Sequence, residues 1–169
     1  MSRLRLAAVI ALAVVSCVLA TSAAAHANAV FPFRADSGDN CRYGSTQGSL
    51  IWRYSTTTPI RPIALDVRGT LVDHPLPDEW GFLCRDDGYY SVATFVAYLS
   101  NGTTSRAEAR ADAALVSLDF TLGSSTATAS ISRATVQVCR SPLFGTGPSY
   151  CGPPQHYAPV VYDPPPPIP

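Results

Sequence analysis

The sequence contains no lysine, and all of its basic side chains are arginines. These arginines are scattered and form no run or patch. Two of them lie in a predicted leader, so the remaining chain is expected to carry a net charge of about −2. Binding to nucleic acid or to an anionic membrane surface requires clustered basic side chains, so neither partner is expected. The lack of lysine beside abundant Ala and Arg suggests a GC-rich genome, such as that of an actinobacterium.

Motifs of catalytic chemistry are also missing. The sequence has no G-x-S-x-G, no H-E-x-x-H and no glycine loop that could hold a phosphate. Only His74 and His156 follow the leader, and a general base needs a partner that orients it. No C-x-x-C or paired-histidine spacing indicates a metal site. The sequence therefore predicts no cofactor and no metal, and it does not favour an enzyme.

Residues 1–29 have the pattern of a secretory signal peptide. Two arginines precede an apolar run over residues 6–15, which is too short to span a bilayer as a helix. Small residues then lead to two overlapping A-x-A cleavage sites, which place the start of the mature chain at Asn28 or Val30. We therefore expect a secreted, extracellular protein without stable membrane insertion, in a compartment where disulfides persist.

An alternative interpretation of the leader involves Cys17. The stretch Val14–Cys17 is similar to a bacterial lipobox, and lipid attached to Cys17 would anchor the protein to a membrane. The stretch begins with Val where Leu is usual, and apolar and small residues continue to Ala25. Cleavage by signal peptidase I is the preferred expectation.

Four cysteines follow the leader, and an even number in a secreted chain predicts two disulfides. Three pairings are open from the sequence alone. We expect the second pair to be Cys139–Cys151, which closes a short loop rich in Gly and Pro, and this leaves Cys41–Cys84 as the first. Each bridge is expected to stabilise the fold by about 2–4 kcal/mol.

Alternation of apolar and polar residues with period two predicts about six to eight short strands separated by turns. The clearest pattern covers 63–71, where Gly69 indicates a bulge or a close backbone approach. Residues 89–99 are apolar on both faces and predict a central strand that ends at the hairpin signal Asn101–Gly102. A short strand is predicted over 50–54, with Trp52 in the core.

Two further segments change the parity of their alternation and therefore predict bulges. Residues 106–113 are expected to form a strand that continues into 114–122 after a bulge at Ala113–Ala114. The segment 126–139 changes parity at Ser132–Arg133. Together these elements predict an all-β fold: a small antiparallel β-sandwich of immunoglobulin-like or related Greek-key architecture.

The sequence divides into a signal peptide (1–29), a disulfide-containing β domain (30–152) and a Pro-rich tail (153–169). Because proline cannot donate to a ladder, we expect the tail to be disordered or extended and separate from the fold. It could dock in an aromatic groove, act as a spacer against the cell wall, or remain a solvated terminus.

The connection over residues 73–90 holds the densest group of residues that could bind a ligand. Its carboxylates could bind calcium or perform acid/base chemistry, and an indole could stack on a sugar ring. The alternative is a solvated connection in which Asp86-Asp87-Gly88 forms a turn. The candidate ligand-binding residues are His74, Asp78, Glu79, Trp80, Asp86 and Asp87.

The segment Pro159–Pro164, with the sequence Pro-Val-Val-Tyr-Asp-Pro, resembles the reactive site of the Streptomyces subtilisin inhibitor family. The resemblance implies a protease inhibitor with Val160 at the specificity position and the scissile bond before Val161. The chain departs from the family pattern at Ala158, where the family has a disulfide-bonded Cys, and in ending soon after the motif.

The function expected first is a non-enzymatic binding or surface-interaction module that recognises an extracellular protein or glycan. This expectation follows from a secreted β fold without catalytic motifs. One alternative is a secreted hydrolase or a calcium- or carbohydrate-binding domain that uses the 73–90 connection. The other alternative is a subtilisin-inhibitor-like protease inhibitor that uses residues 159–164.

Overall fold

The structure is a computed structural model that describes residues 28–73, 88–123, 129–144 and 149–160. Within these ranges the chain is all-β and contains no helix. Nine strands follow one another along the described chain: β1 (Ala29–Asp36), β2 (Gly44–Tyr54), β3 (Pro62–Asp73), β4 (Tyr89–Leu99), β5 (Thr104–Ala111), β6 (Leu115–Gly123), β7 (Ile131–Pro142), β8 (Tyr150–Cys151) and β9 (Gln155–Tyr157).

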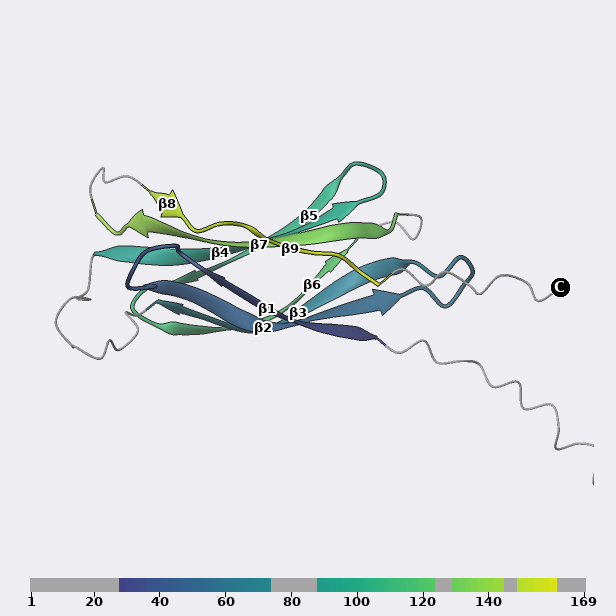
Figure 1. The fold of residues 1–169 in the computed structure, drawn as a ribbon, viewed down its shortest axis with the longest axis horizontal. Coiled ribbons are helices and arrows are strands. Elements are labelled where there is room, and N and C mark those ends of the chain that lie inside the picture. Colours follow the sequence, from purple (N-terminus) through teal and green to yellow (C-terminus); the bar gives the residue numbers. More distant parts are fainter. Residues whose placement is uncertain (1–27, 74–87, 124–128, 145–148, 161–169) are drawn as a thin grey trace, which may run out of the picture.

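The strands form two antiparallel sheets that lie over one another as two layers (Figure 1). One sheet has the order β1-β2-β3-β6, and we call it sheet A. The other has the order β5-β4-β7-β8, with β9 also paired to β7, and we call it sheet B. The predicted all-β class is therefore confirmed at the level of two antiparallel sheets.

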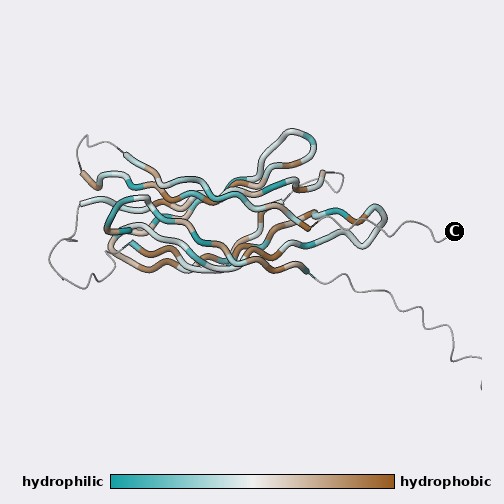
Figure 2. The backbone as a smooth tube through the Cα atoms, in the orientation of Figure 1, coloured by the Kyte–Doolittle hydropathy of each residue, from teal (hydrophilic) through white to brown (hydrophobic). Residues whose placement is uncertain are grey.

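The core lies between the layers and takes alternate residues from strands β1 to β7. Figure 2 shows hydrophobic and hydrophilic residues along both layers of the backbone. Trp52 is fully buried, which confirms its predicted place in the core. The ring of Phe95 packs edge-on against Phe33 at 5.5 Å and Phe120 at 5.2 Å between ring centres. These contacts join sheet B to both β1 and β6 of sheet A and fix the packing of the layers.

The centre of sheet A contains a close backbone approach between β2 and β3. Gly48 and Gly69 face each other in the ladder. A Cβ on Gly48 would lie 2.1 Å from the carbonyl oxygen of Arg68, and one on Gly69 would lie 2.2 Å from that of Gln47. The close approach predicted for Gly69 is therefore confirmed, and the ladder continues through it without a register shift.

Strand β4 agrees with the sequence prediction. It covers Tyr89–Leu99 and lies between β5 and β7, which confirms its central position. The hairpin expected at Asn101–Gly102 is present, and Gly102 has a φ of 82°, a conformation that glycine adopts easily. The bulge expected near Ser132 is also present, because Tyr98 pairs with Arg133 and Leu99 pairs with Ile131.

The bulge predicted at Ala113–Ala114 is wrong. The chain turns there and crosses from sheet B to sheet A, so β5 and β6 are separate strands in different layers. Ala113 has a φ of 46°, and its N–H donates to Asp73 Oδ2 at 2.9 Å. A change in the alternation of apolar and polar residues predicts a break in the strand. Here the break is a turn between the two sheets, and the buried Asp73 carboxylate stabilises it.

The prediction of a separate tail from residue 153 is wrong for its first eight residues. Strand β9 pairs with β7, with Val136 opposite Gln155 and Ala134 opposite Tyr157. We call residues 153–160 the C-terminal strap. The strap holds its place because the edge of β7 offers backbone partners and because side chains on sheet A bind it. Residues 161–169 lie outside the described ranges.

The strap connects the two sheets on the side of β1 and β7. The Tyr157 hydroxyl accepts from the Arg34 N–H at 3.2 Å and donates to the Arg34 carbonyl at 3.4 Å. The Tyr54 hydroxyl donates to the Val160 carbonyl at 3.0 Å. A Cβ on Gly152 would lie 1.9 Å from the Asp36 carbonyl oxygen, so only glycine fits where the strap begins.

Candidate functional site

The strand ends that flank four connections lie at one end of the molecule, which we call the loop end (Figure 1). These four connections join β1 to β2, β3 to β4, β5 to β6 and β7 to β8. Backbone hydrogen bonds hold their bases together: Asp73 N–H donates to the Ala114 carbonyl, and Leu143 N–H donates to the Gly88 carbonyl, each at 2.9 Å. Strands from both sheets therefore position the loop end.

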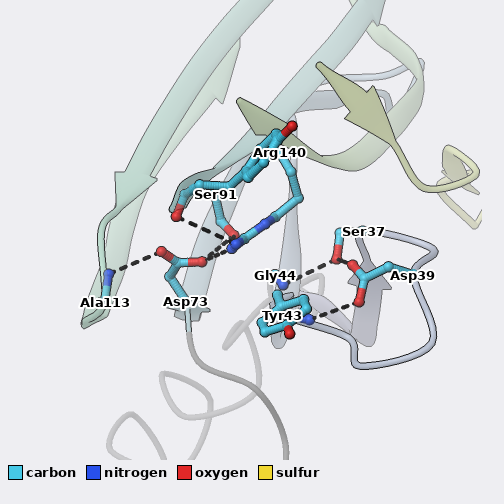
Figure 3. Close-up of polar contacts among 9 residues, drawn as sticks. Ser37, Asp39, Tyr43, Gly44, Asp73, Ser91, Ala113 and Arg140 are labelled. Atoms are coloured by element: carbon cyan, nitrogen blue, oxygen red, sulfur yellow. Dashed lines mark hydrogen bonds and ion pairs between the residues drawn. The ribbon is translucent and has the colours of Figure 1, made fainter. Parts of the chain in front are cut away.

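A buried polar cluster of Asp73, Ser91 and Arg140 lies directly beneath the loop end (Figure 3). Arg140 is 1% exposed and Asp73 is 4% exposed. Arg140 Nη1 donates to Asp73 Oδ1 and, at 2.9 Å, to Ser91 Oγ. Ser91 Oγ donates to the same carboxylate oxygen at 2.8 Å. A buried charge pair is tolerated only when such additional hydrogen bonds satisfy it.

The cluster follows from the alternation of three strands. Asp73 ends the inward row of β3, Ser91 begins that of β4, and Arg140 extends that of β7. This cluster was not among the sites predicted from the sequence. The alternation of residues along β3 and β7 could have revealed it. Asp73 and Arg140 occupy positions that continue the series of core-facing apolar residues, and a charge at such a position requires a partner.

The cluster fixes the start and end of two connections. The second carboxylate oxygen of Asp73 accepts the Ala113 N–H, which holds the β5–β6 turn. Arg140 Nη2 donates to the Tyr89 carbonyl at 3.4 Å, just after the connection from β3. Ser91 is fully buried and already bonded to a carboxylate and a guanidinium. Because substrate cannot reach this hydroxyl, the cluster positions loops and supplies no nucleophile.

The neighbouring β1–β2 turn is closed by its own side chains (Figure 3). The Ser37 hydroxyl donates to Asp39 Oδ2 and accepts the Gly44 N–H at 3.1 Å. Asp39 Oδ1 accepts the Tyr43 N–H at 3.2 Å. Both carboxylate oxygens of Asp39 are therefore used within the turn.

Tyrosines surround the buried arginine at the loop end. The guanidinium carbon of Arg140 lies 5.1 Å from the ring centre of Tyr43 and 5.9 Å from that of Tyr89. The rings of Tyr89 and Tyr150 lie 5.8 Å apart. Phe144, next to the Leu143–Gly88 hydrogen bond, is 89% exposed. Among its described residues, the loop end thus presents a group of half-buried tyrosines and the exposed side chain of Phe144.

All six predicted ligand-binding residues lie outside the described ranges, so their predicted role stays a prediction. They are His74, Asp78, Glu79, Trp80, Asp86 and Asp87. Asp73 and Gly88, which flank them, lie at the loop end. Among the described residues, no group of three or more His, Cys, Asp or Glu side chains could hold a metal ion.

The predicted pair Cys139–Cys151 is confirmed, and these cysteines lie opposite each other in the β7–β8 ladder. Cys41 is also disulfide-bonded, but Cys84 lies outside the described ranges and the pair Cys41–Cys84 stays a prediction.

His156 lies on exposed β9, where its Nδ1 is 3.3 Å from Thr135 Oγ1.

Only the first two residues of the segment that resembles a subtilisin inhibitor are described. Pro159 is half-buried, and Val160 is 42% exposed with its carbonyl bound by Tyr54. The bond proposed as scissile follows Val160, and the remainder of the segment lies outside the described ranges.

Comparisons with known protein families, curated proteins and solved structures find no match to this chain. No helix in the described part of the chain is long and apolar enough to span a membrane.

Proposed function

We propose that this protein is a secreted, non-enzymatic binding module with a β-sandwich of immunoglobulin-like or related Greek-key architecture. Its ligand is an extracellular protein or glycan, and the loop end is the surface that binds it. Functional loops are typically carried on a rigid scaffold, because the scaffold limits the entropy lost on binding.

The observation that carries the proposal is the buried Asp73–Ser91–Arg140 cluster under the loop end. Burying a charge pair contributes little to stability on average, whereas it specifies one arrangement of the groups it joins. Here the groups joined are the bases of the β3–β4 and β5–β6 connections. A scaffold that uses a buried ion pair to hold loops in place is suited to presenting them.

The side chains at this surface also favour binding. Tyrosine gives a large contact area with few rotatable bonds, and an exposed aromatic ring gains most when a partner covers it. Tyr43, Tyr89 and Tyr150 are half-buried, while Phe144 is exposed. The surface therefore combines rigid aromatic contacts with one anchor residue.

The position of the two ends of the described chain also supports the loop end as the binding surface. Ala29 pairs with Trp52, and Val160 contacts Tyr54, so both ends of the described chain lie at the end of β2 opposite to the loop end. A chain attached to the cell through either end would direct the loop end outward. The loop end would then be free to contact a partner.

The test is binding of the fluorescently labelled mature chain to intact cells of the source organism, measured by flow cytometry. Phe144→Asp should lower the affinity at least about tenfold, because it places a charge at the centre of the proposed contact. Val30→Asp is the matched control, since Val30 is an exposed apolar residue (58%) at the opposite end. Equal loss in the two variants, or no binding by the wild type, would contradict the proposal.

The same assay separates the proposal from the calcium- or carbohydrate-dependent alternative. We expect binding to survive EDTA, and to survive Asp78→Ala combined with Glu79→Ala. Loss of binding in both treatments would instead favour a calcium site in the 73–90 connection.

A further inference from the structure

Strand β5 forms an edge of sheet B. It pairs with β4 along its length without a register shift, and no described strand pairs with its other side. The Gly123 N–H donates to Ser105 Oγ at 3.2 Å, which holds the start of β5 near the end of β6. The stretch from Arg106 to Asp112 continues beyond that contact, and an edge of this kind can accept another strand.

The register determines which backbone groups face outward. Leu99 N–H donates to the Thr103 carbonyl at 2.9 Å at the hairpin. Backbone groups in an antiparallel ladder alternate in direction, so the odd-numbered residues of β5 face β4. The N–H and C=O groups of Arg106, Glu108 and Arg110 therefore face away from the sheet and are the ones available to a new strand.

The exposed side chains of this stretch alternate in charge in a self-complementary order. Arg106, Glu108, Arg110 and Asp112 have side chains 47–61% exposed, while the alanines between them face the core. If a second copy of β5 pairs antiparallel about Ala109, Arg106 lies opposite Asp112 and Glu108 lies opposite Arg110. Shifting the register by two residues in either direction instead places Arg opposite Arg or Glu opposite Asp.

Backbone hydrogen bonding and charge pairing both favour the register in which Ala109 faces Ala109. The residues that carry outward backbone groups are also the residues that become charge pairs when Ala109 faces Ala109 of the second copy. Within one copy these charges already interact weakly, Arg106 with Glu108 and Arg110 with Asp112. The hydrogen bond from Arg106 lowers the pKa of Glu108 below its ordinary value, so this carboxylate is charged at neutral pH.

We propose that β5 is a homodimerisation edge, at which two copies pair antiparallel about Ala109 and join their B sheets into one. Opposite charges directly across a ladder stabilise a pair, and like charges destabilise it. One strand pair buries less area than a typical stable interface, so the dimer is weak and reversible. Because β5 runs toward the loop end, antiparallel pairing directs the two loop ends in opposite directions, which would let one dimer bridge two partners.

The experiment is sedimentation velocity of the disulfide-bonded mature protein over a wide concentration range. The wild type should dimerise at high concentration, and salt should weaken the dimer because the charges are exposed. Glu108→Arg places Arg opposite Arg, and Arg110→Glu places Glu opposite Glu, so each variant alone should remain monomeric. A mixture of the two variants should dimerise again, because every pair across the twofold axis then joins opposite charges.

The double variant Glu108→Arg/Arg110→Glu provides a second check, because it reverses the order of charges and keeps the complementarity. It should dimerise about as well as the wild type. Arg68→Glu is the matched control, since it disrupts an exposed ion pair with Asp119 on sheet A and should leave the dimer unchanged. A wild type that stays monomeric would show that the charges only protect the edge. A dimer that persists in both single variants would place the contact elsewhere.

Discussion

At the residue scale, the buried pair of Asp73 and Arg140 matters because each charge depends on the other. The Asp73 carboxylate accepts hydrogen bonds from a guanidinium, a hydroxyl and a backbone N–H. If the guanidinium is removed, a carboxylate remains in a nearly water-free site with only neutral donors. The cost of leaving one charge unpaired exceeds the net contribution of the intact pair.

Arg140→Met should therefore lower the free energy of unfolding by about 3–5 kcal/mol. Urea unfolding followed by tryptophan fluorescence measures this change. Arg68→Met is the control, because Arg68 is 65% exposed in its pair with Asp119, and such pairs contribute about 1 kcal/mol or less. Adding Asp73→Leu to Arg140→Met should recover part of the loss. A loss for Arg140→Met no larger than that for Arg68→Met would show that the pair is not energetically buried.

The pair could be predicted from the sequence in part. The inward rows of β3 and β7 end in an acid and a base, and a core position tolerates such residues only with a partner. The sequence could not show which acid meets which base. That choice depends on β3 and β7 lying in different sheets with Ser91 between them.

At the scale of elements, the C-terminal strap contacts both sheets, although its proline content predicted a tail separate from the fold. The prolines of the strap cannot donate a backbone hydrogen bond to a ladder. Strand β9 contains no proline, so it can pair with β7. Tyr157 also binds both backbone groups of Arg34 at the edge of sheet A. The strap thus covers the edge of β7 and joins it to β1.

Truncation after Pro154 should destabilise the domain by about 2 kcal/mol or more, because it uncovers backbone groups of β7 and removes Tyr157. Thermal unfolding by circular dichroism measures the shift. A chain truncated after Val160 is the matched control, since it keeps every described contact of the strap. Equal melting temperatures for the two truncated chains would mean that the strap is not part of the cooperative unit.

Strands with a strong apolar pattern were predictable from the sequence, and their partner strands were not. The prediction for 89–99 was correct because its apolar residues exclude exposure on either face. The prediction of a bulge between 106–113 and 114–122 was wrong because parity is a local property. A bulge and a turn between sheets leave the same parity change, and the hydrogen bond from Ala113 to Asp73 selects the turn.

At the scale of the whole molecule, the predicted removal of residues 1–29 and the formation of disulfides would set the form of the protein outside the cell. Strand β1 begins at Ala29, where the predicted signal peptide ends. Cys139–Cys151 connects β8 to β7 just beside Arg140, so this bridge and the loop end share one strand.

The intact mass of protein purified from the culture medium should correspond to a chain that starts at Asn28 or Val30. It should also be lower than the all-thiol mass by the hydrogens lost in two disulfides. Reduction and alkylation should then label Cys41, Cys84, Cys139 and Cys151 only. A membrane-bound form that starts at lipid-modified Cys17 would contradict secretion and identify an anchored protein.

The sequence alone determined the strand periodicity and the Asn101–Gly102 hairpin, which depend on neighbouring residues. It narrowed Gly69 to a bulge or a close approach, and it favoured Cys139–Cys151 among three open pairings of cysteines. The tertiary structure decided which residues meet from distant parts of the chain. It joined Asp73 to Arg140 beneath the loop end, placed β9 on β7 and left the charges of β5 at an edge that no described strand covers. Pairing of strands from two sheets depends on the global packing of the layers, and a local pattern is compatible with several such packings.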